Sequence, residues 1–208
     1  MRKILLFVWA CMGLVCLMSA CKTSVKSKEW KLVWVEDFDQ KNSFDESVWT
    51  KIPRGTSDWN NYMSYYDSCY AMQDGNLILR GIANHTQKND TAPYLTGGVY
   101  TKGKKLFTGG RVEVCARLQA AKGAWPAIWM LPEKAEWPKG GEIDIMERLN
   151  HDHIAYQTTH SYYTHILGIK DNPPHGGINK INPEEYNIYS VDIYPDSLVF
   201  AVNHRHTY

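Results

Sequence analysis

The most constraining feature of the chain is the run Gly-Gly-Glu-Ile-Asp-Ile-Met-Glu, in which three carboxylic acids are threaded through β-forming residues. Side chains of a β-strand point to alternate faces, so Glu142 and Asp144 share one face. Glu147 comes five residues after Glu142 and would fall on the opposite face of a regular strand. One extra residue, Ile145 or Met146, absorbed as a β-bulge turns Glu147 back. The run therefore predicts a bulged strand with three carboxyl groups on one surface.

The spacing of the two outer acids permits a particular chemistry. Glu142 and Glu147 lie about 13 Å apart at Cα once the bulge takes up one step, and two long side chains leaning inward across a curved strand can bring their carboxyls near ~5 Å. A pair at about 5–5.5 Å serves as nucleophile and as acid, then base, in glycoside hydrolysis with retention. The charge of Asp144 disfavours ionisation of a neighbouring carboxyl, which helps to keep the acid protonated. The alternative is a solvated acidic strand, against which the Gly-Gly lead-in and flanking tryptophans argue.

This run resembles the signature of glycoside hydrolase family 16, in the bulged form of its laminarinase-like members. Matched position by position, the resemblance implies that Glu142 is the nucleophile, that Asp144 assists and that Glu147 is the acid/base. From Trp30 onward, short β-rich segments alternate with turn residues and no amphipathic helical period stands out, which favours an all-β fold. The resemblance extends over nearly all of this part and implies a two-sheet β-jelly-roll sandwich of the concanavalin A type, whose concave sheet carries the cleft.

Several segments are predicted as elements of this fold. They are an opening strand at Trp30–Phe38, a short element at Phe44–Trp49, strands within Leu77–Arg80, Gly97–Gly103 and Gly110–Leu118, and a hairpin of Tyr189–Tyr194 with Leu198–Asn203. The chain stops at Tyr208, whereas the resemblance implies further strands that pair with the opening strand and close the sandwich. We therefore expect a domain at residues 30–208 that lacks its last strands, either because it is a truncated product or a fragment, or because something else completes the fold.

The first twenty residues are predicted to be a lipoprotein signal peptide. Arg2 and Lys3 precede an apolar run that is short for a bilayer span. The run ends in Leu-Met-Ser-Ala-Cys at Cys21, which resembles a bacterial lipobox and implies cleavage before Cys21 and a lipid on that residue. A polar tether at 21–29 would follow, and the protein would be anchored in the bacterial cell envelope, at the outer membrane or the cell surface. A plain signal peptide or an N-terminal anchor helix is the alternative.

Charge and cysteine content limit the partners of the mature chain. Loss of residues 1–20 removes two positive charges and no negative ones, so the formal net charge falls from +1 to −1. No basic field remains that would attract nucleic acid. Cys69 and Cys115 stay in the mature domain, where a disulfide and two separate thiols are both open.

Tryptophans close to the acids are candidates for sugar binding. Trp125 and Trp129 fall on one face by the period of two, and indole rings stack well on the apolar faces of pyranoses. Trp137, just before the acids, can do the same; for all three, a place in the core is the alternative. His160 matches a family position that faces the cleft near the acid/base, with an ordinary surface histidine as the alternative.

The remaining candidates for substrate binding are polar residues. Relatives that cleave glucans have an Asn-Glu segment on the donor side of the cleft, whereas this chain has Tyr62 in place of the acid. Arg54 and Asn60 or Asn61, of which we select Asn61, can supply polar contacts instead, or serve a plain loop. The pairs His151/His153 and His204/His206 lack a third ligand at a recognisable interval, so we expect no catalytic metal. The C-terminal part of the structural calcium pattern found in some family members is absent from the sequence.

The combined expectation is an endo-acting, retaining β-glycosidase that needs no cofactor and hydrolyses β-1,3-glucan or mixed β-1,3/1,4-glucan. A β-galactan or a mucin-type O-glycan is the main alternative substrate. The alternatives from another class are a non-catalytic sugar-binding lipoprotein and an inactive fragment, because a fold shared with lectins does not assign function.

Overall fold

The computed structural model describes residues 30–40, 42–170 and 174–208. The chain divides into two compact units, residues 1–31 and 32–208, and the description below concerns the second unit. The predicted signal peptide and Cys21 lie outside the described residues. Within the described residues, no helix is long and apolar enough to cross a membrane.

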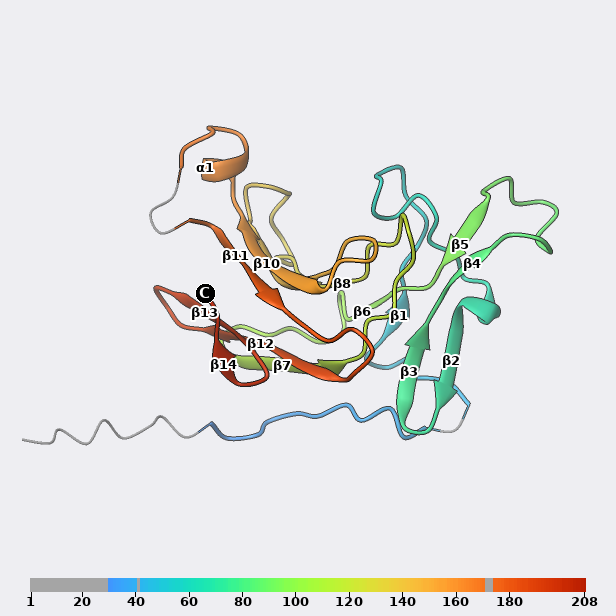
Figure 1. Ribbon diagram of the computed structural model, residues 1–208, viewed down its shortest axis with the longest axis horizontal. Coiled ribbons are helices and arrows are strands. Elements are labelled where there is room, and N and C mark those ends of the chain that lie inside the picture. Colours follow the sequence, from blue (N-terminus) through green and yellow to red (C-terminus); the bar gives the residue numbers. More distant parts are fainter. Residues whose placement is uncertain (1–29, 41, 171–173) are drawn as a thin grey trace, which may run out of the picture. The chain divides into compact units, whose positions relative to one another are not determined.

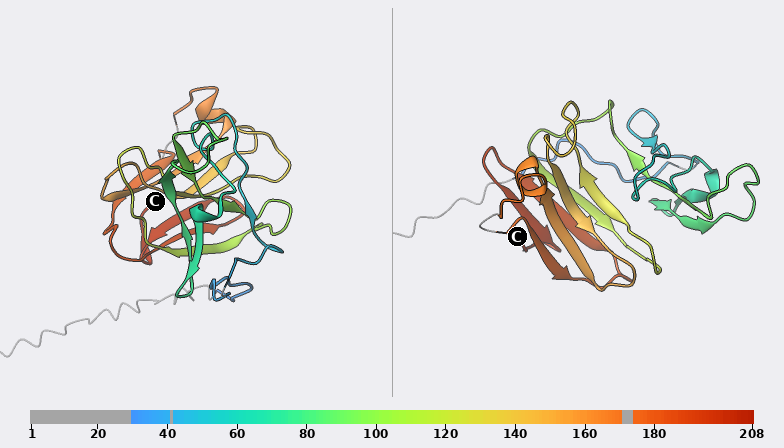
Figure 2. Two further views of the ribbon diagram at one scale, coloured as in Figure 1. Left: turned by 90° about the vertical axis from the view of Figure 1, so that its right-hand side faces the viewer. Right: turned by 90° about the horizontal axis from the view of Figure 1, so that it is seen from above.

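Two four-stranded antiparallel sheets form the larger part of this unit (Figure 1). The first sheet has the order β11 (Gly176–Lys180), β10 (Ile154–His160), β9 (Glu142–Glu147) and β8 (Ala127–Met130). The second has the order β14 (Arg205–His206), β13 (Leu198–Val202), β12 (Asn187–Ile193) and β7 (Gly110–Ala116). Figure 2 shows the strands of the two sheets running as neighbouring layers. The predicted all-β sandwich is confirmed.

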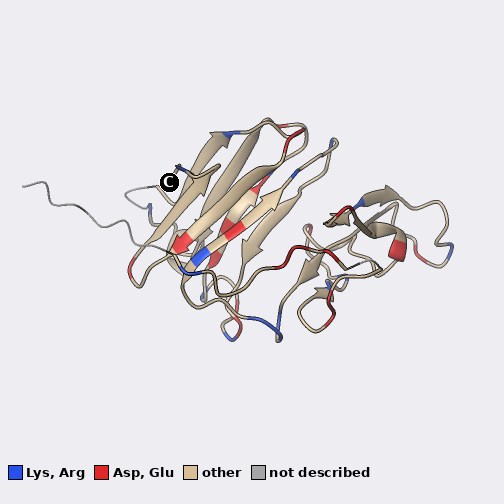
Figure 3. Ribbon diagram, turned by 90° about the horizontal axis from the view of Figure 1, so that it is seen from below, with Lys and Arg blue, Asp and Glu red and all other residues tan. Residues whose placement is uncertain are grey.

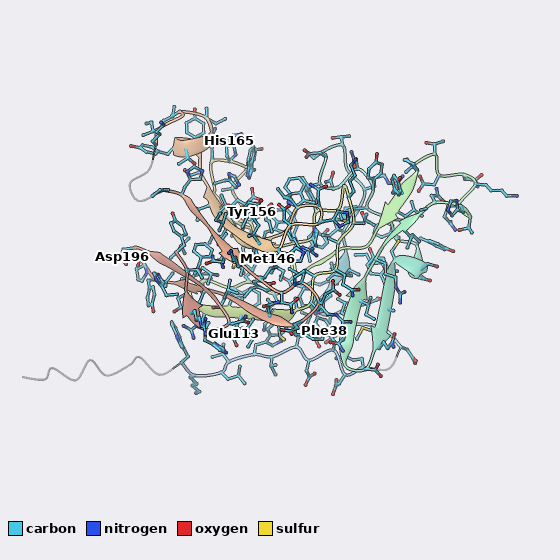
Figure 4. All side chains as sticks on the ribbon, in the orientation of Figure 1. Phe38, Glu113, Met146, Tyr156, His165 and Asp196 are labelled. Carbon is cyan, nitrogen blue, oxygen red and sulfur yellow. The ribbon has the colours of Figure 1, made fainter. Side chains whose placement is uncertain are left out.

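The hydrophobic core lies between the two sheets. Tyr189, Val191 and Phe200 of the second sheet are fully buried in one cluster with Ile145 and Met146 of the first. Met146 is labelled in Figure 4. Each large apolar side chain buried in this way contributes about 1.5–3 kcal/mol, so the packing of the sheets fixes which face of β9 is turned away from the core.

An ion pair lies on the outer face of the second sheet. Arg111 on β7 donates two hydrogen bonds to Asp192 on β12, at 2.6 and 2.8 Å, directly across the pair of strands. Figure 3 shows the acidic and basic positions on the ribbon from below. Opposite charges on neighbouring strands support the register of the pair.

Three two-stranded ribbons are built from residues 50–100. They pair β1 (Thr50–Lys51) with β6 (Val99–Tyr100), β2 (Tyr70–Gln73) with β3 (Asn76–Leu79), and β4 (Gly81–Ala83) with β5 (Tyr94–Thr96). Asp74 and Gly75 both have positive φ, 52° and 69°, as the tight turn between β2 and β3 requires. A short 3-10 helix at Asp67–Cys69 precedes β2, and the four-residue helix α1 (Tyr162–His165) follows β10.

Cys69 is buried and Cys115 is exposed, and both are free thiols, so the disulfide alternative does not hold in this structure.

The predicted strands are found with one exception. Strands β6, β7 and β13 lie within the expected ranges, and β3 and β12 overlap theirs but begin earlier, at Asn76 and Asn187. The expected opening strand at Trp30–Phe38 is wrong: residues 30–40 form no strand, and the side chains of Leu32 and Val33 are 76% and 90% exposed. A strand needs a neighbour for its backbone groups, and none of the described strands pairs with this segment.

Side chains hold this segment in place instead of a sheet ladder. Glu36 accepts a hydrogen bond from the Trp49 indole at 3.0 Å, and the ring of Trp34 lies 5.8 Å from that of Phe107. Residues 45–49, where a short element was expected, form a turn in which Trp49 N donates to Asp45 O at 2.8 Å.

Candidate active site

The predicted bulge is present in β9. On β10, His160 lies opposite Glu142, Thr158 opposite Asp144, and Tyr156 opposite Glu147, so two residues of β9 face one of β10 between the last two pairs. Ile145 and Met146 are both buried in the core. This arrangement places three carboxyl side chains on the face of the first sheet away from the core, hereafter the acid-bearing face.

A buried glutamine completes the bulge. Gln157, the β10 residue opposite the bulge, is fully buried, and its Nε2 donates to the carbonyl oxygen of Ile145 at 3.0 Å. Its Oε1 accepts from Asn179 at 3.2 Å and from Thr207 at 2.5 Å. A bulge disrupts the ladder locally, and the Gln157 amide gives the Ile145 carbonyl a side-chain partner at this point.

The lead-in to β9 explains the glycine pair of the sequence. Gly141 has a φ of +79°, a conformation that residues with a side chain rarely adopt. A Cβ on Gly140 would stand 2.3 Å from Cγ of Pro132 and 2.6 Å from Cβ of Ala135. The two glycines therefore let the 131–141 loop pack closely against the start of the strand that carries the acids.

Asp144 is the most buried of the three acids, with 2% of its surface exposed. Burial raises the pKa of Asp144 to about 8, and the charges of Glu147 and Glu142 and a hydrogen bond with Glu142 add to the rise. Its Oδ2 lies 3.2 Å from Nε2 of His160 but accepts no hydrogen bond of good geometry. At neutral pH Asp144 therefore carries a proton that it can share with Glu142.

Glu147 is also held in an environment that favours its acid form. Burial raises the pKa of Glu147 above its ordinary value, and the charge of Glu142 adds a smaller rise. The Trp125 indole, which donates to Oε1 at 2.8 Å, and the nearby His160 act in the opposite direction. A carboxyl with a raised pKa retains its proton closer to neutral pH, as a general acid requires.

Glu142 is contacted by the loop before it. The indole nitrogen of Trp137 donates to Glu142 Oε2 at 2.5 Å. The Trp137 ring in turn meets the ring of His165 edge-on, at a centroid distance of 4.5 Å. His165, labelled in Figure 4, ends helix α1, whose start is fixed by a capping box between Ser161 and Thr164.

The tryptophans lie at the surface or on the acid-bearing face. Trp125 and Trp137 are 47% and 46% exposed, which excludes the core alternative for them. Trp129 lies opposite Asp144 on β8, whereas its neighbours Ile128 and Met130 pack against the core. Alternation along the strand therefore puts Trp129 on the acid-bearing face as well.

The two polar candidates lie in the loop of residues 54–64. Arg54 directs its guanidinium to Asp90 in a two-pronged pair at 2.6 and 2.7 Å and to the carbonyl oxygen of Met63 at 3.0 Å, so it orders this loop. Asn61 has a buried Oδ1 without a hydrogen-bond partner. The structure does not bring Arg54 into contact with the three acids.

Two residues at the site were missed by the sequence analysis. Trp59 meets Trp129 edge-on at 5.0 Å, and His165 contacts Trp137 as described above. Serine is a preferred N-cap residue, so Ser161 is a local signal for the start of the helix that bears His165. No local pattern indicates the contact of Trp59, because its partner lies seventy residues further along the chain.

Among the described residues, no three His, Cys, Asp or Glu side chains gather in a way that could hold a metal ion.

The sequence and the fold are both similar to those of known proteins. A family model described as "XgeA-like, catalytic GH16 domain" matches residues 55–176, more than half of the chain. The fold matches the laminarinase of Rhodothermus marinus with a TM-score of 0.75 and 29% identity, covering 86% of this chain and 74% of that one. These are glycoside hydrolases of the jelly-roll type. The chain belongs to glycoside hydrolase family 16.

Relatives with curated names differ in what they cleave. The chain is 37% identical over 191 residues to a keratan-sulfate endo-1,4-beta-galactosidase of Sphingobacterium multivorum, covering 89% of this chain and 44% of that protein. It is 30% identical over 200 residues to a beta-glucanase of Rhodothermus marinus, covering 90% and 68%. The chain thus spans less than half the length of the first relative and about two thirds of the second.

Proposed function

We propose that the protein is an endo-acting, retaining β-glycosidase that hydrolyses β-1,3-glucan or mixed β-1,3/1,4-glucan. The observation that carries the proposal is the bulged strand, which gathers Glu142, Asp144 and Glu147 on one face in three different environments. A retaining mechanism needs two carboxyls in different protonation states on either side of one glycosidic bond.

The proposed reaction has two steps. In the first, the Glu142 carboxylate attacks the anomeric carbon while Glu147 gives its proton to the departing oxygen, and a glycosyl-enzyme forms. In the second, Glu147 takes a proton from water, which attacks the anomeric carbon and releases Glu142. Asp144 holds its proton toward Glu142 and reduces repulsion between the acids. No step uses a cofactor.

The experiment compares the parent protein with Glu142→Gln on laminarin and on mixed-linkage β-glucan. The amide keeps the shape of the side chain but is no nucleophile, so cleavage should fall about a thousandfold or more while binding persists. The exposed Glu185 provides the matched control, Glu185→Gln. Proton NMR of the first products should show the β-anomer; a first product in the α-form, or parent-like cleavage by Glu142→Gln, would contradict the proposal.

A second substrate class is supported by the relative that is 37% identical and is named for cleavage of keratan sulfate. Tyr62 stands where glucan-cleaving members carry an acid, and its ring lies 6.1 Å from that of Tyr94. A panel of laminarin, mixed-linkage glucan, β-galactan and keratan sulfate separates the two classes. Faster cleavage of a galactan than of either glucan would assign the protein to the galactan-cleaving class.

We also propose that the mature protein is held in the bacterial cell envelope by a lipid on Cys21. The support is the Leu-Met-Ser-Ala-Cys sequence after an apolar run with two basic residues at its start. Labelled fatty acid should be incorporated into the parent and not into Cys21→Ala, and the parent should sediment with membranes. Secretion of the unchanged protein without label would refute the anchor.

A further inference from the structure

A second set of residues extends the acid-bearing face beyond the acids. In one cross-strand row, Glu147 is followed by Tyr156 on β10 and then by Ile178 on β11. In the next row, Asp144 is followed by Thr158 and then by Gly176. Residues opposite each other on antiparallel strands point to the same side, so both rows continue the surface on which the three acids lie.

The outer part of these rows forms a hollow of about 360 Å³. Its lining includes Tyr156, Thr158, Pro174, His175, Gly176 and Ile178. Ile178 is 65% exposed, and Gly176 brings no side chain to the middle of the hollow. We call this surface the shelf. It presents the aromatic ring of Tyr156 and the apolar side chain of Ile178, with the backbone of Gly176 beside them.

This shelf suits the flat, apolar face of a pyranose. The Tyr156 hydroxyl donates to Asp152 Oδ2 at 2.8 Å, which fixes the direction of the ring. Aromatic rings with a fixed direction form good platforms for sugar faces, and a neighbouring aliphatic side chain extends the contact. Figure 4 labels Tyr156 on its strand.

Acidic and basic side chains both lie around the shelf. Its lining includes His175, it adjoins Glu147 and Asp144, and the exposed Lys180 follows Ile178 by two residues on the same face of β11. Arg148, the nearest arginine in sequence, is buried and donates to the carbonyl oxygens of Asp152 and Leu118. The contact with a sugar therefore rests on the apolar surface of Tyr156 and Ile178.

We propose that Tyr156 and Ile178 bind a sugar residue on the leaving-group side of the scissile bond and thereby select what that sugar can be. The assignment of the shelf to the leaving-group side rests on the proposed function, in which Glu147 protonates the leaving oxygen. The shelf lies on the β11 side of Glu147, whereas Trp129 and Trp59 lie on the β8 side. At about 4.8 Å between strands, Ile178 stands roughly 10 Å from Glu147, within reach of the sugars that leave.

The test compares a β-linked oligosaccharide with an aryl β-glycoside, whose leaving group is not a sugar. Tyr156→Ala should lower kcat/KM for the oligosaccharide about tenfold and lower it much less for the aryl glycoside, because the lost stacking concerns only a sugar leaving group. Ile178→Ser should act in the same direction, and Tyr156→Phe, which keeps the ring, should recover most of the loss. Transfer of the glycosyl group to an added neutral acceptor sugar should fall in parallel.

Tyr65, which is 60% exposed and lies on another part of the chain, gives the control Tyr65→Ala. Equal losses on both substrates in Tyr156→Ala, or parent-like oligosaccharide cleavage, would overturn the shelf. Failure of the parent to cleave either substrate would instead count against the proposed function, and the shelf is then tested by calorimetry, with weaker oligosaccharide binding expected in Tyr156→Ala.

Discussion

At the scale of single residues, the three acids are distinguished by their surroundings. Asp144 is buried, Glu147 is partly buried and accepts a hydrogen bond from the Trp125 indole, and Glu142 accepts one from the Trp137 indole. The same functional group thus has three environments on one strand. Because burial disfavours the charged form, the pKa values of Asp144 and Glu147 are both raised.

The roles of Glu142 and Glu147 can be told apart by an added nucleophile. With an activated aryl β-glycoside, Glu147→Ala should accumulate a glycosyl-enzyme that azide attacks, giving the β-glycosyl azide. Glu142→Ala leaves room for azide to attack directly, giving the α-glycosyl azide. NMR of the products reads the configuration. The opposite pairing of variant and product would exchange the two roles.

The raised pKa of Asp144 makes stability depend on pH. Because its pKa rises from an ordinary 3.8 to about 8 on folding, the folded chain binds one proton more than the unfolded chain between these values. The free energy of unfolding should therefore fall as the pH rises from about 4 to about 8. Asp144→Asn cannot ionise and should flatten this dependence, by on the order of a few kcal/mol over the range. Urea unfolding at several pH values measures it; an unchanged slope would contradict the assignment.

At the scale of elements, strand β9 depends on its neighbour for its shape. Gln157 on β10 supplies the amide that satisfies Ile145 at the bulge, so the position of Glu147 is set partly from across the sheet.

We expect Gln157→Leu to cost about 1–3 kcal/mol, because a buried carbonyl loses its partner. The variant should also lose activity out of proportion to its stability, since Glu147 follows the bulge. The control is Asn179→Ala, which removes the bond from Asn179 to Gln157 Oε1 and leaves the bond to Ile145 intact. Chemical unfolding and kcat at low temperature separate the two effects. Full activity in a destabilised Gln157→Leu would mean that the bulge forms without this amide.

Helix α1 acts on the start of β9, because His165 contacts Trp137 and Trp137 donates to Glu142. Trp137→Phe keeps an aromatic ring but removes the N–H that Glu142 accepts, so kcat should fall about tenfold or more. His165→Ala removes the ring that meets Trp137 and should lower kcat in the same direction but less, while His165→Phe should restore it. Tyr163, exposed on the same helix, gives the control Tyr163→Ala. A change in KM alone would show that the loop binds substrate without orienting Glu142.

At the scale of the whole unit, stability is concentrated between the two sheets. Phe200→Ala should cost about 3–5 kcal/mol, because a fully buried ring leaves a cavity. Val33→Ala, in the exposed N-terminal segment, should change stability by less than about 0.5 kcal/mol. Thermal or urea unfolding of the 32–208 unit checks both. A large loss in Val33→Ala would mean that this segment packs against another surface.

The site was more predictable than the architecture around it. Period-two alternation and the count of residues between Asp144 and Glu147 are local properties, so the bulge and its three acids follow from six residues. The segment Trp30–Phe38 has residues that favour a strand, but a strand forms only where a neighbouring strand supplies hydrogen bonds. The sequence of the segment does not indicate whether such a neighbour is present. Contacts such as Trp59 with Trp129 depend on how distant loops meet, which single-sequence patterns do not contain.

The bulge affects how the length of this strand can change during evolution. Deletion of Met146 alone would leave Glu-Ile-Asp-Ile-Glu, in which regular alternation again puts all three acids on one face. The three acids therefore stay on one face at either length of the strand. The shorter strand destabilises the core, because the core loses a buried methionine. A one-residue deletion here should accordingly be repaired by a larger side chain on the facing sheet, at Val191 or Val202, and not by any change among the acids.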